Sequence, residues 1–446
     1  KEEALVKAIE KSGDASLTLS DLKQDPDCLD TWFSSWLWPI SLFNGILDPD
    51  NEEFRYYYPT TDLVTAPDII FFWVSRMIIA GYEFCGDKPF SNVYFTGIVR
   101  DKLGRKMSKS LGNSPDPLEL IAKYGADGVR MGIMLAAPAG HDIMYDDSLC
   151  EQGRNFCNKI WNAFRLVKGL NVADIEQPQA AHEAVRWFRA KLAASVAEID
   201  DLFGKFRISE ALMVVYRLFW DEFSSWYLEM VKPAYGSPMD TATYEATLKF
   251  FDDLLRLLHP FMPFITEELW QHLQERADGE SVMYAPMPGM DGADADVLAS
   301  MENAKEVVIG VRSVRASKNR APKQPLELRV VGSAPVAEAG IVGKLANLSA
   351  ITHVEAKDPA AASFMVGAVE FNVPLEDSID VEAEMAKMQK DLEYYQGFLN
   401  SVLKKLGNER FVSNAPAAVV DAERRKQADA EAKIAALKAS MAALVR

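Results

Sequence analysis

The most regular hydrophobic pattern lies at the end of the chain. Apolar residues recur at alternating spacings of four and three over 381–406, and the same spacing returns over 427–444. Such a heptad predicts two helices that share one apolar seam. Gly407-Asn408 ends the first helix and the loop through 414–416 starts the second. We therefore expect an antiparallel coiled-coil hairpin over 377–446. A dimerising coiled coil is the alternative, but a helix that turns back fills its own seam, which favours a monomer.

The middle of the chain predicts two further domains. Apolar residues recur at spacings of three and four between 212 and 230, as expected for one face of a packed helix. They are Leu212, Val215, Phe219, Phe223, Trp226 and Met230. Residues 151–297 are therefore interpreted as an all-α bundle. Residues 298–376 form a small α+β domain in this interpretation. It has a basic helix over 305–318, a strand over 326–331, an Ala/Gly-rich helix, and strands near 351–354 and 364–373.

The first part of the chain has an α/β pattern. A helical pattern covers 69–79, and the β-branched and aromatic run 90–99 predicts one buried strand. A polar loop over 101–113 and a helix over 117–124 follow. Residues 26–150 are assigned to this α/β domain, and residues 1–25 to a helix and linker that belong to something upstream.

Composition excludes several classes of protein. The chain has 446 residues, of which 49% are hydrophobic and 25% charged, so it is neither disordered nor fibrous. No apolar run approaches the roughly 20 residues of a membrane helix. The four cysteines form no CxxC pair, which argues against a cysteine zinc site or disulfide framework and favours the cytoplasm. No metal ligands are predicted. The net charge of −17 disfavours indiscriminate nucleic-acid binding, although local basic patches still bind phosphates.

The loop after the predicted strand carries the chemistry. Five cations lie between Arg100 and Lys109, and Gly104 and Gly112 flank the central residues. A loop that leaves a strand at the carboxyl edge of an α/β sheet is well placed to bind a ligand. The simpler interpretation is a solvated surface loop rich in lysine.

Residues 106–110 read KMSKS, and this segment resembles the signature of class I aminoacyl-tRNA synthetases. The resemblance implies a Rossmann-like catalytic domain that uses ATP with Mg²⁺. Mobile lysines would neutralise the phosphates as an amino-acid carboxylate attacks the α-phosphorus. The resemblance assigns catalysis to Lys106 and Lys109, and ATP contacts to these two together with Met107, Ser108, Ser110 and Gly97. A glycine required by the exit of the strand is the alternative for Gly97.

Two further segments resemble the valyl-tRNA synthetase family. They are DTWFSS at 30–35 and DIIFFW at 68–73, and they separate this family from its isoleucyl and leucyl relatives. Ile69 and Trp73 are four residues apart and would share a helix face, where with Trp32 they would wall a small apolar pocket. In the family the matching positions hold the valine side chain. Asp68 would bind the substrate ammonium or ribose, or cap the helix. Core packing is the alternative for the three apolar residues.

Two parts expected of such an enzyme are missing from the chain. No two of the five histidines are three residues apart, so no HxGH signature is present. An apolar pocket separates valine from threonine by only about 10², which is why this family carries an editing domain. We expect both parts upstream of Lys1, so that the chain is the carboxyl-terminal portion of a longer enzyme and is inactive alone.

Basic residues outside the loop predict contacts with tRNA(Val). The bundle resembles an anticodon-binding domain and the hairpin resembles a tRNA-binding arm. Residues 387–446 carry eleven basic and seven acidic side chains, which makes the hairpin locally basic. The candidate residues are Arg154, Lys159, Arg312, Arg315, Lys404, Lys405, Arg424 and Arg425. Surface solubilisation is the alternative for the first two.

Three interpretations remain open from the sequence. The first is part of a valine--tRNA ligase with valine, ATP and tRNA(Val) as partners, no membrane association and a monomeric state. The second is an isoleucyl or leucyl relative. The third is a non-catalytic tRNA-binding or coiled-coil interaction protein.

Overall fold

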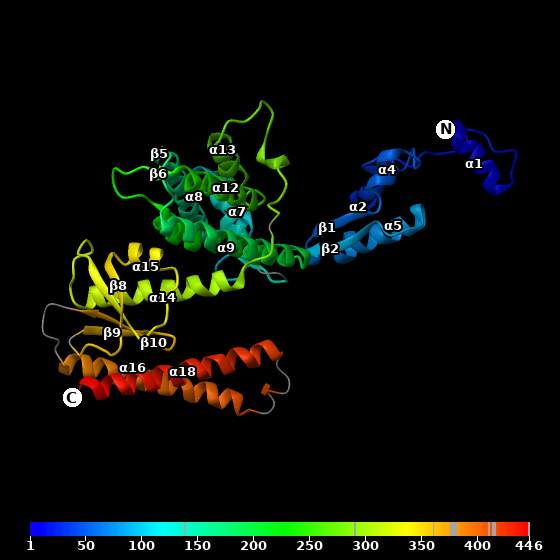
Figure 1. Cartoon of the computed structure of the whole chain (residues 1–446). Coiled ribbons are helices and arrows are strands. Elements are labelled where there is room, and N and C mark those ends of the chain that lie inside the picture. Colours follow the sequence, from blue (N-terminus) through cyan, green and yellow to red (C-terminus); the bar gives the residue numbers. More distant parts are fainter. Residues whose placement is uncertain are drawn as a thin grey trace. The chain divides into compact units, whose positions relative to one another are not determined.

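The structure, a computed structural model, describes residues 1–137, 140–289, 291–359, 361–374, 381–408, 411–412 and 416–444. It divides into two compact units (Figure 1). Unit 1 comprises Lys1–Ser114 and Ala137–Tyr145, and unit 2 comprises Pro115–Ala136 and Asp146–Arg446. The predicted boundary at residue 150 therefore differs from the structure, because residues 115–136 belong to unit 2. The predicted boundary at 297 falls inside a helix, and the one at 376 lies outside the described residues.

Unit 1 is a small α/β assembly. Its elements are α1 (Glu2–Ser12), α2 (Thr31–Trp36), α3 (Trp38–Ser41), α4 (Glu52–Tyr57), β1 (Thr60–Thr65), η1 (Pro67–Ile69), η2 (Ile70–Val74), α5 (Ser75–Cys85), β2 (Phe90–Phe95), β3 (Val99–Arg100), η3 (Lys109–Leu111) and β4 (Ile143–Met144). Strands β1 and β2 pair in parallel, and β3 pairs in parallel with β4. A small cluster around Val74, Met77 and Phe90 forms its apolar centre.

Two predicted elements of unit 1 are corrected by the structure. The single strand expected over 90–99 is two strands, β2 and β3, which pair with different partners. Gly97 separates them, and its α-carbon lies so close to the carbonyl oxygen of His141 that an added β-carbon would be 2.1 Å from it. The single helix expected over 69–79 is a succession of a 3₁₀ turn, a π-helical turn and an α-helix.

Unit 2 contains a helical bundle. Its elements are α6 (Pro117–Tyr124), α7 (Ala126–Leu135), α8 (Asp147–Lys168), β5 (Val172–Ala173), α9 (Gln179–Gly204), α10 (Ile208–Arg217), η4 (Leu218–Tyr227), α11 (Leu228–Val231), β6 (Met239–Asp240), α12 (Thr241–Leu258), α13 (Pro263–Leu273) and η5 (Val282–Tyr284). Asp residues cap several of these helices, as Asp146 does for α8 through the amide of Ser148.

Aromatic side chains fill the centre of the bundle. Phe188, Phe219, Phe223 and Phe251 are completely buried and contact one another edge-to-face or tilted. The helical spacing of apolar residues predicted that Trp226 faces this core. In the structure Tyr227 is buried there, and Trp226 is only half-buried. The reason is the π-helical geometry of η4, whose wider turns shift the buried face by one position.

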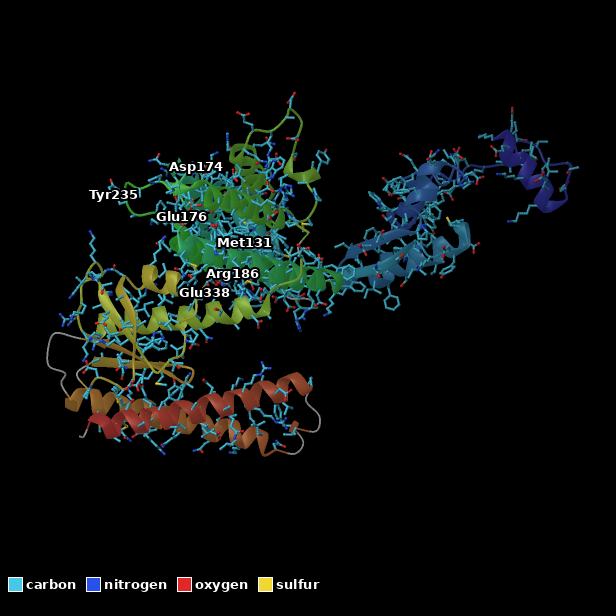
Figure 2. All side chains as sticks on the ribbon, in the orientation of Figure 1. Met131, Asp174, Glu176, Arg186, Tyr235 and Glu338 are labelled. Carbon is cyan, nitrogen blue, oxygen red and sulfur yellow. The ribbon has the colours of Figure 1, made fainter. Side chains whose placement is uncertain are left out.

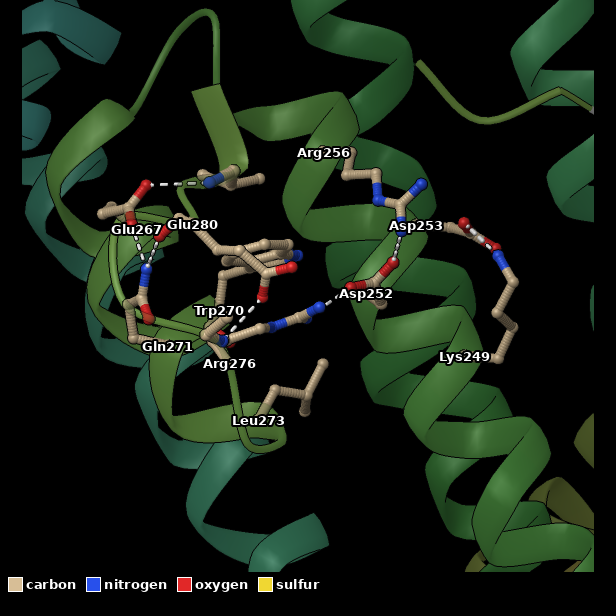
Figure 3. Close-up of polar contacts among 12 residues, drawn as sticks. Lys249, Asp252, Asp253, Arg256, Glu267, Trp270, Gln271, Leu273, Arg276 and Glu280 are labelled. Atoms are coloured by element: carbon tan, nitrogen blue, oxygen red, sulfur yellow. Dashed lines mark hydrogen bonds and ion pairs between the residues drawn. The ribbon is translucent and has the colours of Figure 1, made fainter. Parts of the chain in front are cut away.

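A polar network fastens the segment after α13 to the bundle (Figure 3). Arg276 donates to Asp252 of α12 at 3.0 Å and stacks on the ring of Trp270, with its guanidinium carbon 3.4 Å from the ring centroid. Glu267 accepts from the Ser281 hydroxyl at 2.7 Å and from the Val282 amide at 3.0 Å. Charge-assisted hydrogen bonds therefore fix the connection between α13 and the following helix to the bundle.

The next part of unit 2 is a mixed sheet with two helices. These elements are α14 (Ala295–Ser317), β7 (Leu326–Val331), α15 (Ala339–Leu345), β8 (Leu348–Val354), β9 (Ala361–Val366) and β10 (Val369–Pro374). The strand order is β8-β7-β10-β9, with β7 and β8 parallel and the other pairs antiparallel. The predicted α+β pattern holds here. The predicted segment 364–373 is a hairpin, whose turn uses Gly367 at φ 56°.

Side chains tie this sheet region to helix α9 of the bundle. Arg186 of α9 donates to Glu338 at 2.7 Å, and both residues are labelled in Figure 2. Ser300 of α14 donates to the same carboxylate at 2.9 Å. Glu183 accepts the amide of Ile341 at 2.9 Å, at the start of α15. Since one apolar cluster also runs from the bundle into the sheet, bundle and sheet share a core.

Two long helices, α16 (Val381–Leu406) and α18 (Ala417–Leu444), follow the sheet. Lys405 lies 3.7 Å from Glu423, and Lys433 lies over the ring of Tyr395, so the helices run antiparallel. Met388, Leu392, Val402 and Ala430 are buried along their contact. The predicted loop residues 414–415 lie outside the described residues. The Ser440 hydroxyl of α18 donates to Glu370 of β10 at 3.0 Å.

Candidate active-site loop and nucleic-acid interface

The loop begins at a short parallel ladder in unit 1. Arg100 of β3 forms an ion pair with Asp142, which also accepts the amide of Ile98 at 3.2 Å. The hydrogen bond from Arg100 holds the pKa of Asp142 below its ordinary value. The residue Gly97 has a structural explanation here, because its close approach to His141 leaves no room for a side chain.

The Asp101 carboxylate organises the first half of the loop. Its Oδ1 accepts the amides of Leu103 at 3.0 Å and Arg105 at 2.9 Å, which closes a tight turn around Gly104. Its Oδ2 accepts Nε of Arg105 at 2.7 Å and Nδ2 of Asn113 at 3.0 Å. These donors, Asn113 foremost, hold the pKa of Asp101 far below its ordinary value. The side chain is 11% exposed.

The Asn113 side chain organises the second half. Its Oδ1 accepts the amide of Ser108 at 2.9 Å, and its Nδ2 lies 3.3 Å from the carbonyl oxygen of Lys106. The Ser108 hydroxyl accepts the amide of Leu111 at 3.2 Å and so caps the 3₁₀ turn η3. Gly112 ends this turn in the left-handed region at φ 62°. The KMSKS residues are therefore held at their backbone.

Lys106 and Lys109 project from this scaffold into solvent. The backbone of Lys106 bridges to Arg100, while both lysine side chains are exposed. Within the described part of the chain, neither ammonium group has an ion pair or hydrogen bond. Met107 and Ser108 are half-buried, and the Ser110 hydroxyl lies 3.1 Å from that of Ser108. The arrangement presents two unpaired cations on an ordered loop, which suits a polyanion.

The predicted pocket residues gather around α2 and η2. Trp32 stacks on Phe72, with ring centroids 6.0 Å apart, and Trp73 donates its indole N–H to the carbonyl of Ser35 at 3.0 Å. Trp73 also packs against the apolar cluster of unit 1, so the core interpretation holds for part of its ring. Ile69 is half-buried. Sequence reasoning missed Phe72 as the partner of Trp32, because the π-helical turn could not be read from spacing.

Asp68 lies exposed in the first turn of η1. The capping role considered for it is not seen, since the residue at the helix start is Ala66 and no side chain among the described residues caps this turn. Asp68 instead adds to the field that raises the pKa of Arg100, after the larger effect of Asp142. Its carboxylate is free to meet a cationic group.

The first two predicted tRNA contacts lie on α8. Arg154 is exposed and donates to the carbonyl of Lys123 at 2.9 Å. The Lys159 ammonium lies over the ring of Trp220, 5.3 Å from its centroid. Both cations are therefore oriented by neighbours in the bundle.

The prediction for Arg315 is corrected by the structure. Arg315 is 7% exposed, and its guanidinium donates to the carbonyls of Ala321, Gln324, Ala346 and Asn347. With its donors used inside the fold, this residue joins α14 to the start of the sheet and does not face a phosphate. Arg312 is exposed, with its guanidinium on the carbonyl of Leu345. Spacing along the helix could not separate the two.

The four cations of the long helices are exposed. Lys404 and Lys405 lie at the end of α16, and Arg424 and Arg425 lie near the start of α18. Because the helices run antiparallel, these residues share one end of the pair. Arg424 lies 3.4 Å from Asp421. No helix among the described residues is long and apolar enough to cross a membrane.

Comparison with known proteins assigns each part of the chain. Residues 1–146 match the class I tRNA synthetases of the I, L, M and V group. Residues 185–330 match the anticodon-binding domain of tRNA ligases, and residues 380–445 match the valyl tRNA synthetase tRNA binding arm.

The curated relatives agree along the whole chain. Valine--tRNA ligase of Phocaeicola vulgatus is 67% identical over 99% of this chain and 51% of its own length. The Geobacillus stearothermophilus enzyme of the same name is 39% identical over 96% of this chain and 50% of its own length. A solved Agrobacterium radiobacter K84 agnB2 LeuRS–tRNA–LeuAMS complex is similar at a TM-score of 0.47, with 21% identity over 62% of this chain and 35% of that chain. The chain spans about half the length of the curated relatives, and it belongs to the valyl-tRNA synthetase family.

Proposed function

We propose that the protein containing this chain is a valine--tRNA ligase that activates valine with ATP and transfers it to tRNA(Val). The observation that carries this proposal is the ordered KMSKS loop, on which Lys106 and Lys109 are exposed and unpaired among the described residues. Family membership and the names of the curated relatives support the assignment of the reaction.

The proposed activation step needs no nucleophile from the protein. A carboxylate oxygen of valine attacks the α-phosphorus of ATP, and the bond from that phosphorus to the bridging oxygen breaks to release pyrophosphate. A hydroxyl at the end of the tRNA then attacks the carbonyl carbon of the adenylate and AMP leaves. Negative charge gathers on the departing phosphates, so Lys106 and Lys109 would stabilise the transition state more than the ground state.

Other groups of the loop would position the nucleotide. Met107, Ser108 and Ser110 would line the ATP site, with Gly97 at the edge of the strand. ATP would bring Mg²⁺ on its phosphates.

The aromatic cluster of unit 1 is the proposed valine site. Trp32, Ile69 and Trp73 would hold the isopropyl group, and Asp68 would meet the ammonium group. Phe72 joins this set because of its stacking on Trp32. A pocket of this kind gains affinity from apolar burial and separates close analogues weakly.

The basic side chains of unit 2 are the proposed tRNA contacts. Arg154 and Lys159 of the bundle would serve the anticodon-binding domain, together with Arg312. The antiparallel helices α16 and α18 would form the coiled-coil tRNA-binding arm, with Lys404, Lys405, Arg424 and Arg425 on phosphates at its end. We also propose that the protein is a cytoplasmic monomer.

Lysine substitutions in the intact synthetase test the catalytic part. Lys109→Ala and Lys106→Ala should each lower valine-dependent exchange of pyrophosphate into ATP by about 10²-fold, mainly in kcat, since each removes a transition-state charge contact. Lys323→Ala is the matched control, because it removes an exposed lysine of unit 2. Unchanged exchange in both loop variants would contradict the proposal. The 446-residue chain alone should show no exchange, because no HxGH signature is present in it.

A further inference from the structure

The strongest unexplained feature of the KMSKS loop is the pair formed by Asp101 and Asn113. These residues are twelve positions apart and join at 3.0 Å, so their hydrogen bond closes the loop across its base. Asp101 uses both oxygens to accept four hydrogen bonds, and Asn113 uses both its oxygen and its nitrogen. Asp101 is buried and Asn113 is half-buried, and both hold the loop backbone.

The contacts of Asn113 fall on the two residues that bracket Met107. One is the carbonyl of Lys106 and the other is the amide of Ser108. The position of the Lys106 side chain and the start of the turn that carries Lys109 therefore depend on the Asn113 amide. The orientation of that amide depends in turn on Asp101, because the carboxylate accepts from Nδ2 and so directs Oδ1 toward Ser108.

Only a carboxylate at position 101 satisfies this arrangement. An asparagine there has one acceptor oxygen and would present its own N–H₂ group to Nε of Arg105 and Nδ2 of Asn113, which are both donors. Two hydrogen bonds to an ionised group would be lost and donors would face donors.

We propose that Asp101 and Asn113 are positioning residues that hold the KMSKS loop in the form in which Lys106 and Lys109 meet the triphosphate. This inference rests on the proposed function, since it assigns the two residues a role in the same reaction. They act through the backbone of the loop and touch no substrate. Preorganisation of this kind lowers the cost of ordering the lysines in the transition state.

The chain offers a matched control pair elsewhere in unit 1. Asp62 of β1 accepts Nδ2 of Asn92 in β2 at 2.9 Å, so it is a second Asp–Asn hydrogen bond between segments far apart in the sequence. Asp62 is exposed and lies on the two-stranded ladder, away from residues 101–113. Asp62→Asn therefore makes the same chemical change without touching the loop.

The experiment compares Asp101→Asn, Asn113→Ala and Asp62→Asn in the intact synthetase. In valine-dependent pyrophosphate exchange, the two loop variants should lose about tenfold or more in kcat, with the KM for valine unchanged. Hydrogen exchange of the peptide covering residues 101–113, measured without substrates, should become about tenfold faster in both. Asp62→Asn should change neither quantity.

The reciprocal double variant separates positioning from general damage. In Asp101→Asn with Asn113→Asp, the new asparagine donates to the new carboxylate, which still accepts the amide of Ser108. Exchange activity and loop protection should both recover in part relative to Asp101→Asn. A double variant as impaired as the sum of its single changes would overturn the inference.

Lys109→Ala separates failure of the inference from failure of the proposed function. If Lys109→Ala lowers exchange while Asp101→Asn and Asn113→Ala behave like Asp62→Asn, the positioning role is refuted and the function stands. If Lys109→Ala leaves exchange unchanged, the proposed function fails, and the positioning role fails with it. Faster hydrogen exchange without loss of kcat would also refute the positioning role.

Discussion

The bundle of unit 2 and the α/β assembly of unit 1 bury their large hydrophobic side chains very differently. In the bundle, Phe223 and Phe251 have no exposed surface. In unit 1, Phe71 is 80% exposed and Leu47 is 86% exposed. The comparison shows that an apolar pattern predicts which face of a helix or strand is suited to burial. That face is buried only where another element packs against it.

The sheet topology explains the difference. The sequences of parallel strands are usually apolar because helices normally cover both faces of their sheet. Strands β1 and β2 form a two-stranded sheet, which presents too little surface to organise helices on both sides. The bundle instead packs long amphipathic helices around one aromatic centre, and edge-to-face rings there add to the stability that burial provides.

The largest expected effect is therefore in the bundle. Phe223→Ala should lower the free energy of unfolding of unit 2 by about 3–5 kcal/mol, because a completely buried ring leaves a cavity. Urea unfolding followed by far-ultraviolet circular dichroism measures this change. Phe71→Ala in unit 1 is the control and should change stability by less than about 0.5 kcal/mol. Equal losses of stability in the two variants would contradict the difference in burial between the bundle and unit 1.

A smaller effect is expected where polar groups join parts of unit 2. Arg315→Leu keeps the bulk of the side chain but leaves four backbone carbonyls without their donor. Unfolding free energy should fall by about 2–3 kcal/mol. Arg312→Leu, at an exposed guanidinium, should cost much less and serves as the control in the same urea titration. A large loss of tRNA affinity with no loss of stability in Arg315→Leu would restore the original prediction for this residue.

A pH effect just below 6.5 is expected in the bundle. Burial holds the pKa of His259 below its ordinary value of 6.5, although Glu267 and Asp127 act in the opposite direction. Its imidazole Nδ1 lies 2.7 Å from the Thr266 hydroxyl. The unfolded chain therefore takes up a proton as pH falls through about 6.5, while the folded chain resists it. This contribution to stability is complete above 6.5 and is lost as pH falls from 6.5 toward the lower folded pKa.

Thermal unfolding at a series of pH values tests this assignment. The variant His259→Asn places an amide near Thr266 and removes the titrating group, so the decline below 6.5 should become shallower. A decline of the same size in His259→Asn would show that the effect does not come from His259.

The smallest effect on stability is expected on the apolar surface of unit 1. Leu47→Lys places a charge on a side chain that is already in solvent, so the unfolding free energy should change by less than about 0.5 kcal/mol. Binding of a hydrophobic fluorescent dye should decrease, because an exposed apolar patch becomes smaller. Ala346→Lys, at a buried position of unit 2, should instead destabilise the protein strongly.

The sequence predicted those features that depend on neighbours along the chain. The strand over Leu326–Val331 has the same bounds in the structure, and the helical spacing between Leu212 and Phe223 marks buried residues correctly. The KMSKS segment gave the resemblance to class I synthetases through five adjacent residues, and DTWFSS and DIIFFW gave the resemblance to the valyl family. These signals are local, so one sequence is enough to read them.

Features that depend on distant partners could not be read in this way. Asp101 and Asn113 meet only because the loop folds back on itself, and Arg315 is buried only because the start of the sheet covers it. Tyr227 lies in the core in place of the predicted Trp226 because this segment is a π-helical turn. Spacing rules for α-helices do not include such a turn. For the candidate site residues, spacing along the chain therefore could not predict which distant groups surround them.

The contact of α18 with the sheet attaches one end of the pair of long helices to the rest of unit 2. The Ser440 hydroxyl donates a hydrogen bond to the Glu370 carboxylate. The Lys357 ammonium lies 3.2 Å from the same carboxylate, and the side chain of Lys357 is 8% exposed. The cations at the far end lie about 24 Å away along the helix axis, at 1.5 Å for each residue between Ser440 and Arg424. A small rotation of the helix pair about its contact with Glu370 would therefore displace those cations by a much larger distance.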